Sequence, residues 1–277
     1  MQKITRTKNS YKRMSLNLIR AILARILGQN SRIALAIEVE SKRIQGKGAG
    51  AVTVVEEVAA ILKLLSLKSF EKVIVLDVGA NIGDFSNEIL KSLPNANVYA
   101  FEPSTTARNA LKDRFSNDHR ISISEYAMGK ELGNGILWFD FPGSGWSSLT
   151  RRRLDHFSVS FDLSEEVKLD SLDNWNKNRN LSPTILKIDV EGHELDVLKG
   201  GEKLIMRSQL IQFEFGGSNL DTRTYFQDFW YFFMDRGFTI YRLTPIGPKK
   251  LESYSEHDEC FITSNYFATR SGELSGI

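Results

Sequence analysis

One stretch constrains the fold more than any other: Val73–Ser86, with the sequence VIVLDVGANIGDFS. A short apolar run reaches Asp77, and Gly79 and Gly83 then precede a segment of helical character. This pattern is typical of a parallel strand that turns sharply into a helix, and open parallel sheets bind ligands at the carboxyl ends of their strands. Glycine permits a positive φ or a close backbone approach, and free N–H groups at a helix start can face ligand oxygens. The stretch therefore predicts a doubly wound α/β sheet with a nucleotide-type site.

The spacing within this loop narrows the class of ligand. Asn81 stands where the dinucleotide fingerprint G-x-G-x-x-G has its second glycine, which argues against NAD and for a nucleoside without a pyrophosphate. The next predicted strand, Val98–Phe101, is followed by Glu102, whose carboxylate can accept two hydrogen bonds from ribose hydroxyls. The alternative is an ordinary strand–turn–helix in which the glycines have only a structural function. The acidic Glu102 at the end of the next strand favours the ligand site over this alternative.

Strand-like and helix-like segments alternate along most of the chain, which predicts a doubly wound, mostly parallel sheet with an antiparallel edge. The segment 129–168 breaks this alternation, and we expect an inserted or antiparallel β element there. The predicted strands are 73–78, 98–102, 120–124, 184–190, 209–215, 238–242 and 259–263, and the predicted helices are 83–92, 104–115, 171–178, 193–200 and 222–236.

Five segments in order resemble the FkbM-type S-adenosylmethionine-dependent methyltransferases. The resemblance implies a class I, Rossmann-like methyltransferase fold with S-adenosylmethionine (AdoMet) as cofactor. It also implies transfer of a methyl group to a hydroxyl of a small polar acceptor, for which we favour a sugar or glycan over a polyketide or other secondary metabolite. The matching segments are Leu76–Ser86, Phe101–Ser104, Leu169–Leu172, Leu186–Gly201 and Gln212–Phe215.

Two further functions stay open, because a fold does not name its acceptor. One is an N- or carboxyl-directed methyltransferase on the same fold. The other is an inactive adaptor that binds a membrane or a partner. The expected domains are a basic amphipathic helical segment at 1–45, a helix covering the sheet at 46–70, a methyltransferase domain at 71–265 and a C-terminal tail at 266–277. The resemblance itself covers roughly residues 70–217.

The donor is expected across the carboxyl ends of the first strands. The first loop would contact its methionine part, Asp77 would set that loop or reach the donor's amino group through water, and Glu102 would hold the ribose. The adenine would lie beside the residues after the third strand, an assignment made from position alone. The predicted donor-binding residues are Asp77, Gly79, Asn81, Gly83, Glu102 and Glu125.

The acceptor side is expected after the fourth strand. Asp189 stands near that strand's end, and His193 opens the next helix, where an imidazole can act as a base near neutral pH. Glu214 lies in the apolar run LIQFEF, where a carboxylate is costly unless it is paired or at a pocket edge. We expect Asp189, His193 and Glu214 to be the catalytic residues. The alternatives are a loop-capping Asp189 and an exposed, non-catalytic His193.

Other polar residues are candidates for acceptor binding or for a metal site. GWSSLTRRR at 145–153 combines an aromatic ring, hydroxyls and three arginines, which suit a sugar or an anionic acceptor but also an ordinary solvated loop. A divalent cation held by Asp189, Glu191 and Glu214 is a further alternative, although we expect no metal. The predicted acceptor-binding residues are Trp146, Ser147, Ser148, Lys187 and Glu191.

The charge is distributed unevenly. Residues 1–37 hold eight Lys/Arg and no acid, which leaves 28 basic and 34 acidic residues, a net charge of −6, in the rest. The body is therefore not expected to bind nucleic acid. The single Cys260 fits a reducing, cytoplasmic location.

Residues 12–28 form an amphipathic pattern with an apolar half-cylinder. They predict either peripheral contact with the inner membrane face or packing on the body or on a second subunit of a homo-oligomer, and an organellar transit segment is the remaining alternative.

Overall fold

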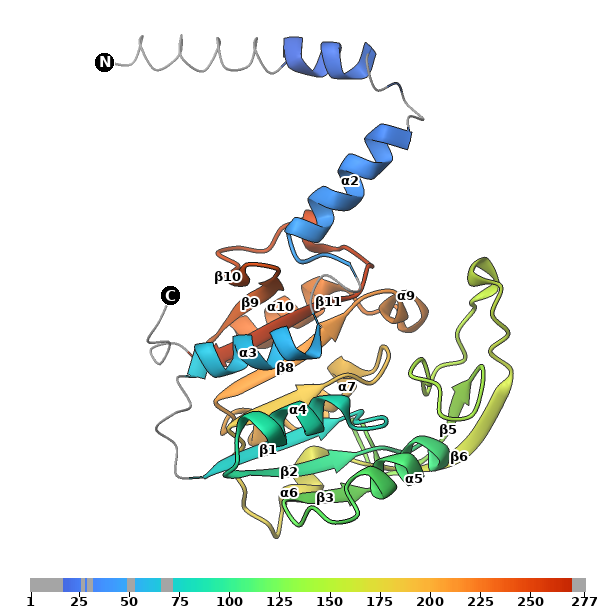
Figure 1. Cartoon of the computed structure of the whole chain (residues 1–277), viewed down its shortest axis with the longest axis vertical. Helices are drawn as coiled ribbons and strands as arrows, with labels where there is room; N and C mark the ends of the chain where they lie inside the picture. Colours follow the sequence, from blue (N-terminus) through green and yellow to red (C-terminus); the bar gives the residue numbers. More distant parts are fainter. Residues whose placement is uncertain (1–16, 26–27, 29–31, 49–52, 66–71, 271–277) are drawn as a thin grey trace. The chain divides into compact units, whose positions relative to one another are not determined.

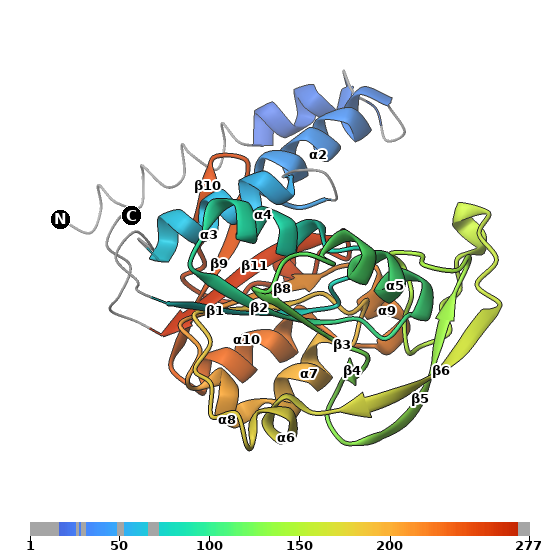
Figure 2. The same cartoon turned by 60° about the horizontal axis from the view of Figure 1, so that its bottom comes forward.

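The structure is a computed structural model that describes residues 17–25, 28, 32–48, 53–65 and 72–270. It divides into two compact units, residues 1–45 and 46–277. In the first unit, residues 17–25 are helical and α2 follows at Arg32–Ile44. The second unit holds a β-sheet with helices on both faces, and the predicted doubly wound, mostly parallel α/β fold is confirmed (Figures 1 and 2).

The main sheet has eight strands in the order β10-β9-β11-β8-β7-β1-β2-β3. The five strands from β8 to β3 pair in parallel, and β11 pairs antiparallel with both β8 and β9. The order reverses between β1 and β7, which makes their carboxyl ends the expected place for a ligand. The strands are β1 Val73–Val78, β2 Ala96–Phe101, β3 Ile121–Ser124, β7 Ile185–Ile188, β8 Leu210–Phe215, β9 Phe238–Thr244, β10 Gly247–Lys250 and β11 Ser264–Arg270.

Side-chain alternation along β1 divides the core into two layers. Val73 and Val75 pack under α3, α4 and α5, whereas Ile74 and Leu76 pack against α6, α7, α8 and α10 on the opposite face (Figure 2). The helices are α3 Val54–Leu65, α4 Asp84–Ser92, α5 Thr105–Arg114, α6 Leu172–Asn176, α7 Glu194–Gly200, α8 Glu202–Ile205, α9 Ser218–Thr222 and α10 Phe226–Met234.

The expected insertion after β3 forms a small sheet of its own. Its strand order is β4-β6-β5, with β4 at Ala127–Met128, β5 at Gly133–Phe139 and β6 at Leu163–Asp170. β5 and β6 pair antiparallel over seven residue pairs and lie beside α5, apart from the main sheet (Figure 1). The long connection between them carries residues 140–162, which return toward the main sheet at the candidate site.

The prediction differs from the structure most clearly at the two ends of the chain. The last strand lies at Ser264–Arg270 and not at 259–263, so the predicted tail from residue 266 is wrong as far as Arg270, and residues 271–277 lie outside the described residues. The reason is the long-range pairing of β11 between β8 and β9, which buries Tyr266 and Phe267. The predicted helix 12–28 is described only at 17–25 and at residue 28, and α2 was not anticipated as a separate helix.

Candidate functional site

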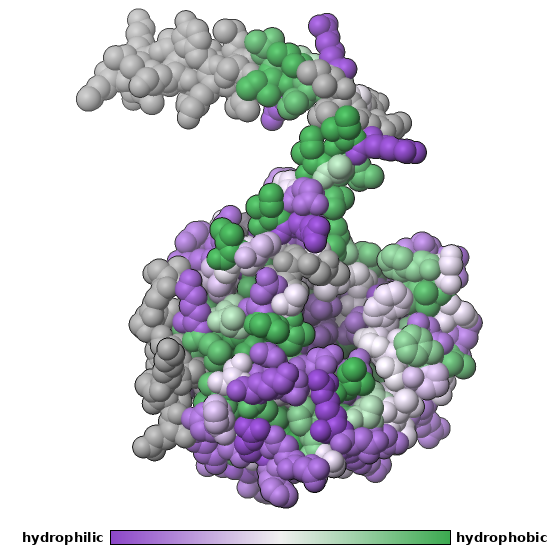
Figure 3. All heavy atoms as spheres, in the orientation of Figure 1, coloured by the Kyte–Doolittle hydropathy of each residue, from purple (hydrophilic) through white to green (hydrophobic). Residues whose placement is uncertain are grey.

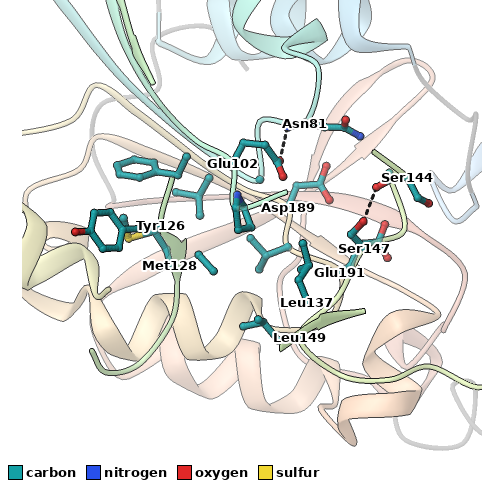
Figure 4. A pocket seen from close by; sticks show the side chains of 17 residues that line it. Asn81, Glu102, Tyr126, Met128, Leu137, Ser144, Ser147, Leu149, Asp189 and Glu191 are labelled. Carbon is teal, nitrogen blue, oxygen red and sulfur yellow. Dashed lines mark hydrogen bonds between the residues drawn. The ribbon is translucent and has the colours of Figure 1, made fainter. Parts of the chain in front are cut away.

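A pocket lies at the carboxyl ends of β1, β2 and β7. Gly79, Glu102 and Asp189 line it from the main sheet, and Ser144 and Ser147 line it from the β5–β6 connection. Figure 4 shows the carboxylates of Glu102 and Asp189 on the same side of this space. The predicted donor loop and the predicted acceptor loop therefore border one cavity.

Gly79 brings these two loops together. Its φ is 82°, and a Cβ at this position would lie 1.7 Å from the carbonyl oxygen of Asp189. Only glycine allows the backbone after β1 to pack directly on the backbone after β7. Asn81, two residues later, also has a left-handed conformation, with a φ of 48°, and its N–H donates a hydrogen bond to Glu102. The first glycine of the loop thus sets the distance between the donor and acceptor sides.

Glu102 is buried at the end of β2 and organises the donor loop. Its Oε2 accepts a hydrogen bond from the N–H of Asn81 at 2.8 Å, and its Oε1 accepts one from the N–H of Ser104 at 2.8 Å. Burial raises the pKa of Glu102 to about 7, although these two hydrogen bonds act in the opposite direction. Each carboxylate oxygen retains a lone pair, so Glu102 can still accept ligand hydroxyls.

The wall of the pocket beyond Glu102 is apolar. Tyr126, Met128 and Leu137 line it, and they come from the β3–β4 segment and from β5 (Figure 4). Glu125 is absent from the lining: its carboxylate is exposed and pairs with Lys168 at 2.6 Å. The pocket lining therefore does not support the predicted contact of Glu125 with the adenine. At this segment the lining comes from the next two residues, Tyr126 and Ala127.

Two other predicted donor residues support the pocket without lining it. Asp77 is fully buried and accepts a hydrogen bond from the Oγ of Ser86 at 2.7 Å. Gly83 has φ 85°, and a Cβ there would lie 2.4 Å from Leu111 and 2.6 Å from Phe115. The second glycine of the loop therefore allows α4 and α5 to pack, and it does not approach the pocket as predicted.

Three carboxylates gather on the acceptor side. Atoms of Asp189, Glu191 and Glu214 all lie within 4.8 Å of one another, which is close enough for them to hold a metal ion together. Burial, followed by the charge of Asp189, raises the pKa of Glu191 to about 8 and that of Glu214 well above its ordinary value. Such a cluster holds protons near neutral pH or takes up a cation. Asp189 and Glu191 line the pocket, whereas Glu214 is not among the lining residues.

His193 lies outside the pocket lining, and both of its ring nitrogens have partners. Nδ1 lies 3.1 Å from Asp196 Oδ2, and Nε2 lies 2.9 Å from Thr150 Oγ1. The structure therefore does not bring His193 together with Asp189 as a base. The neighbouring Glu194 has a structural function: its buried Oε1 accepts hydrogen bonds from the N–H groups of Val190 and Gly192 and so shapes the loop.

The connection between β5 and β6 is fastened to the carboxylate cluster. Ser148 donates from Oγ to the backbone oxygen of Glu191 at 2.7 Å, and Arg152 pairs with the Glu191 carboxylate at 2.8 Å and with Asp221 at 3.2 Å. Ser148 and Arg152 are therefore engaged within the protein, contrary to the prediction that Ser148 binds the acceptor. Arg152 as a partner of Glu191 was not predicted, because only the fold brings them together.

Of the other predicted acceptor-binding residues, Ser147 lines the pocket, whereas Trp146 and Lys187 do not. Ser147 lines the pocket and donates from Oγ to the backbone oxygen of Ser144 at 2.7 Å. Trp146 is 43% exposed, is not part of the lining, and packs against Phe157 at 6.0 Å between ring centroids. Lys187 is buried beneath the pocket, where its Nζ lies 3.0 Å from Asp189 Oδ2 and 3.7 Å from Asp77 Oδ1. Lys187 therefore does not contact an acceptor directly.

The pocket fits AdoMet in three respects. Glu102 can accept ribose hydroxyls, and Tyr126 and Met128 offer an apolar wall to the adenine. The third respect is Asn81, whose buried Oδ1 has no hydrogen-bond partner among the residues that the structure describes. A buried carbonyl oxygen without a donor is costly, and an ammonium group such as that of the methionine part would satisfy it.

Comparison with known proteins agrees with this site. Residues 77–240 match the model of the methyltransferase FkbM domain. The chain is 27% identical over 169 residues to the 2-O-methyltransferase NoeI of Sinorhizobium fredii, covering 57% of this chain and 69% of NoeI. It is 30% identical over 141 residues to the hexuronic acid methyltransferase AglP of Haloferax volcanii, covering 50% of this chain and only 54% of AglP.

Solved structures of methyltransferases are also similar. Precorrin-6y C5,15-methyltransferase of Geobacter metallireducens is 11% identical with a TM-score of 0.42, covering 76% of this chain and 86% of that one. A SAM-dependent O-methyltransferase of Thermotoga maritima is 11% identical with a TM-score of 0.39, covering 79% and 72%. The family match includes the donor loop, Glu102 and the carboxylate cluster, and it covers more than half of the chain. This chain belongs to the FkbM family of AdoMet-dependent methyltransferases.

Proposed function

We propose that this chain transfers the methyl group of AdoMet to a hydroxyl of a sugar or glycan. The observation that carries this proposal is the exposed face of Asp189, a carboxylate that lines the same pocket as the donor loop. Two relatives support the acceptor class, since their names describe a 2-O-methyltransferase and a hexuronic acid methyltransferase. On the acceptor side, Asp189 and Glu191 line the pocket, and their carboxylates can accept hydrogen bonds from the hydroxyls of a sugar.

AdoMet supplies an electrophilic methyl group when it is bound, and the chain's residues supply alignment and a proton acceptor. Glu102 and Asn81 would hold the donor, with Tyr126 and Met128 against the adenine. Asp189 would accept the proton of the acceptor hydroxyl as the oxygen is methylated, a function that needs a carboxylate at hydrogen-bond distance from the hydroxyl. Ser147 would help to position the sugar, and the insertion would limit access of water.

Methylation assays with a panel of acceptors test the proposal. Purified protein would be incubated with isotopically labelled AdoMet and hexuronic acid glycosides, neutral hexose glycosides, or a macrolactone alcohol, and products would be identified by mass spectrometry. We expect label in a sugar O-methyl group. Label only in the macrolactone, in an amine or in a carboxyl ester would contradict the sugar proposal. AdoMet binding without transfer to any of these would favour an adaptor.

Binding of AdoMet should depend on pH through Glu102. Ribose hydroxyls donate to the charged carboxylate, so binding requires the form that predominates above the pKa of about 7. Affinity should therefore rise with pH and should be about tenfold weaker at pH 6 than at pH 8. Glu102→Ala should weaken binding by about 1.5–3 kcal/mol. Isothermal titration calorimetry at several pH values measures both effects.

The matched control for this titration is Glu102→Gln, which keeps the shape of the side chain and cannot ionise. Its residual pH dependence reports the titration of the ligand's own amino group, and this is subtracted from the wild-type curve. A wild-type curve identical to that of Glu102→Gln would remove Glu102 from the ribose site.

We further propose that the N-terminal segment binds anionic membranes. In the described helix 17–25, a continuous apolar arc at 100° per residue consists of Leu18, Ile19, Ile22 and Leu23, and each is at least 47% exposed. Figure 3 shows apolar side chains at the surface of the N-terminal helices. The two arginines of this helix flank the arc, as in helices that lie in a membrane interface. No helix among the described residues is long and apolar enough to cross a membrane.

Vesicle co-sedimentation tests this contact. The full chain should pellet with anionic vesicles at low salt and less at high salt, because each Lys or Arg near the surface contributes about 1 kcal/mol. A version lacking residues 1–45 should remain in the supernatant. Equal pelleting of both forms would contradict the proposal, and a change of oligomeric state on truncation would assign the helix to a subunit contact.

A further inference from the structure

A row of polar side chains is buried beneath the pocket, inside the sheet. Asp77 of β1, Lys187 of β7 and Gln212 of β8 are direct neighbours in the strand register, so their side chains share one face of the sheet. All three are buried. Charged and polar groups in such a position cost free energy unless they are paired. Packing of the apolar core does not account for these three buried polar side chains, so another function is needed to explain them.

Side chains of α3 and α4, which cover this face of the sheet, contact the row. Glu57 of α3 accepts hydrogen bonds from Gln212 Nε2 at 3.1 Å and from Asn265 Nδ2 at 2.6 Å. Phe85 of α4 lies under the Lys187 ammonium, with the ring centroid at 5.4 Å. Burial lowers the pKa of Lys187, but the charges of Asp189, Asp77 and Glu57 outweigh it and raise the pKa above its ordinary value. The contacts with Asp189 and Asp77 therefore favour the charged ammonium form of Lys187.

The ammonium group lies between a structural carboxylate and the pocket. Its shorter contact is with Asp189 Oδ2, at 3.0 Å, and the contact with Asp77 Oδ1 measures 3.7 Å. Asp189 is the partner that reaches the pocket, whereas Asp77 is closed off beneath the donor loop. One oxygen of Asp189 is thus fixed from below by a cation with little freedom to move, and the other oxygen remains for a ligand.

We propose that Lys187 is a positioning residue for methyl transfer, which holds the Asp189 carboxylate in its orientation and supplies the positive charge that an ionised Asp189 requires. This inference rests on the proposed function of Asp189 as the proton acceptor. Lys187 would affect methyl transfer by orienting Asp189, and it would not contact the acceptor itself. This function also explains the buried row. The carboxylates of Asp77 and Glu57 stabilise the ammonium group of Lys187, and that group in turn stabilises Asp189.

A charge-balanced variant tests the inference. Lys187→Met alone would leave Asp77 with an unpaired buried charge and could prevent folding, so the test uses the double variant Lys187→Met/Asp77→Asn, with Asp77→Asn alone as its matched control. Relative to that control, kcat for methyl transfer should fall about tenfold or more, because the proton acceptor loses its orienting partner. The acceptor KM and the AdoMet Kd should change less than about threefold, since Lys187 contacts neither ligand.

A double-mutant cycle shows whether the effect passes through Asp189. If it does, adding Lys187→Met to the Asp77→Asn/Asp189→Asn variant should have no further effect on kcat. An unchanged kcat in the Asp189-containing variant, or an equal further loss without Asp189, would overturn the inference.

The same cycle measured by urea unfolding needs no acceptor. The effects of the Lys187 and Asp189 substitutions on stability should be non-additive, and strict additivity would overturn the inference. If the wild-type chain methylates no sugar, the proposed function fails, while this unfolding cycle still decides whether Lys187 and Asp189 act as a pair.

Discussion

Replacing Asp189 with asparagine is expected to lower methyl transfer about 10²- to 10⁴-fold, the range typical for loss of a general base. The substitution keeps the size of the side chain and removes the carboxylate that is proposed to accept the proton of the acceptor hydroxyl. Binding of AdoMet should change much less, because the donor is expected to contact the loop after β1 and Glu102. The measurement is kcat with a labelled donor, together with calorimetric titration of AdoMet.

His193→Gln is the matched control for this experiment. His193 is four residues from Asp189, but both ring nitrogens are engaged by Asp196 and Thr150 outside the pocket lining. We therefore expect a small change in kcat. If His193→Gln were the more damaging substitution, the base would be His193, which the sequence predicts to be one of the catalytic residues. Loss of wild-type activity in a chelator, with recovery on addition of Mg²⁺, would instead assign Asp189, Glu191 and Glu214 to a cation.

The carboxyl ends of the strands explain why much of the site was visible in the sequence. Glu102 and Asp189 each follow a buried apolar run, and parallel strands place such positions at one edge of the sheet. The pairing of β1 with β7 then brings their ends together, and the loops that follow these two strands border one cavity. For these residues, local pattern and topology lead to the same conclusion.

The residues that were misplaced depend on contacts that local pattern does not contain. His193 is engaged by Thr150, which is 43 positions away and belongs to the insertion. Lys187 resembles an exposed neighbour of Asp189 in the sequence, and only the register of β1, β7 and β8 shows that it is covered by α3 and α4. Glu125 faces solvent and the next residue, Tyr126, faces the pocket, because successive side chains of an extended segment point in opposite directions. The sequence of a short strand end does not show which of the two faces inward.

The second large effect is expected at Gly79, where alanine should disrupt both halves of the site at once. A Cβ at this position would lie 1.7 Å from the carbonyl oxygen of Asp189, and neither backbone can move without shifting a whole loop. We expect Gly79→Ala to lower the free energy of unfolding by at least about 3 kcal/mol, as severe overpacking does, and to abolish measurable AdoMet binding. Urea unfolding and calorimetry measure these two quantities.

Gly237 provides the matched control, because it separates backbone strain from the steric clash. Its φ of 76° is close to the 82° of Gly79, but a Cβ there would have no atom within 4 Å. Gly237→Ala should therefore show only the cost of a left-handed alanine, about 1–2 kcal/mol, with normal AdoMet binding. If Gly79→Ala cost no more than Gly237→Ala, the loop after β1 could not lie against the backbone of Asp189. The close approach of the donor and acceptor loops, on which a shared site depends, would then be wrong.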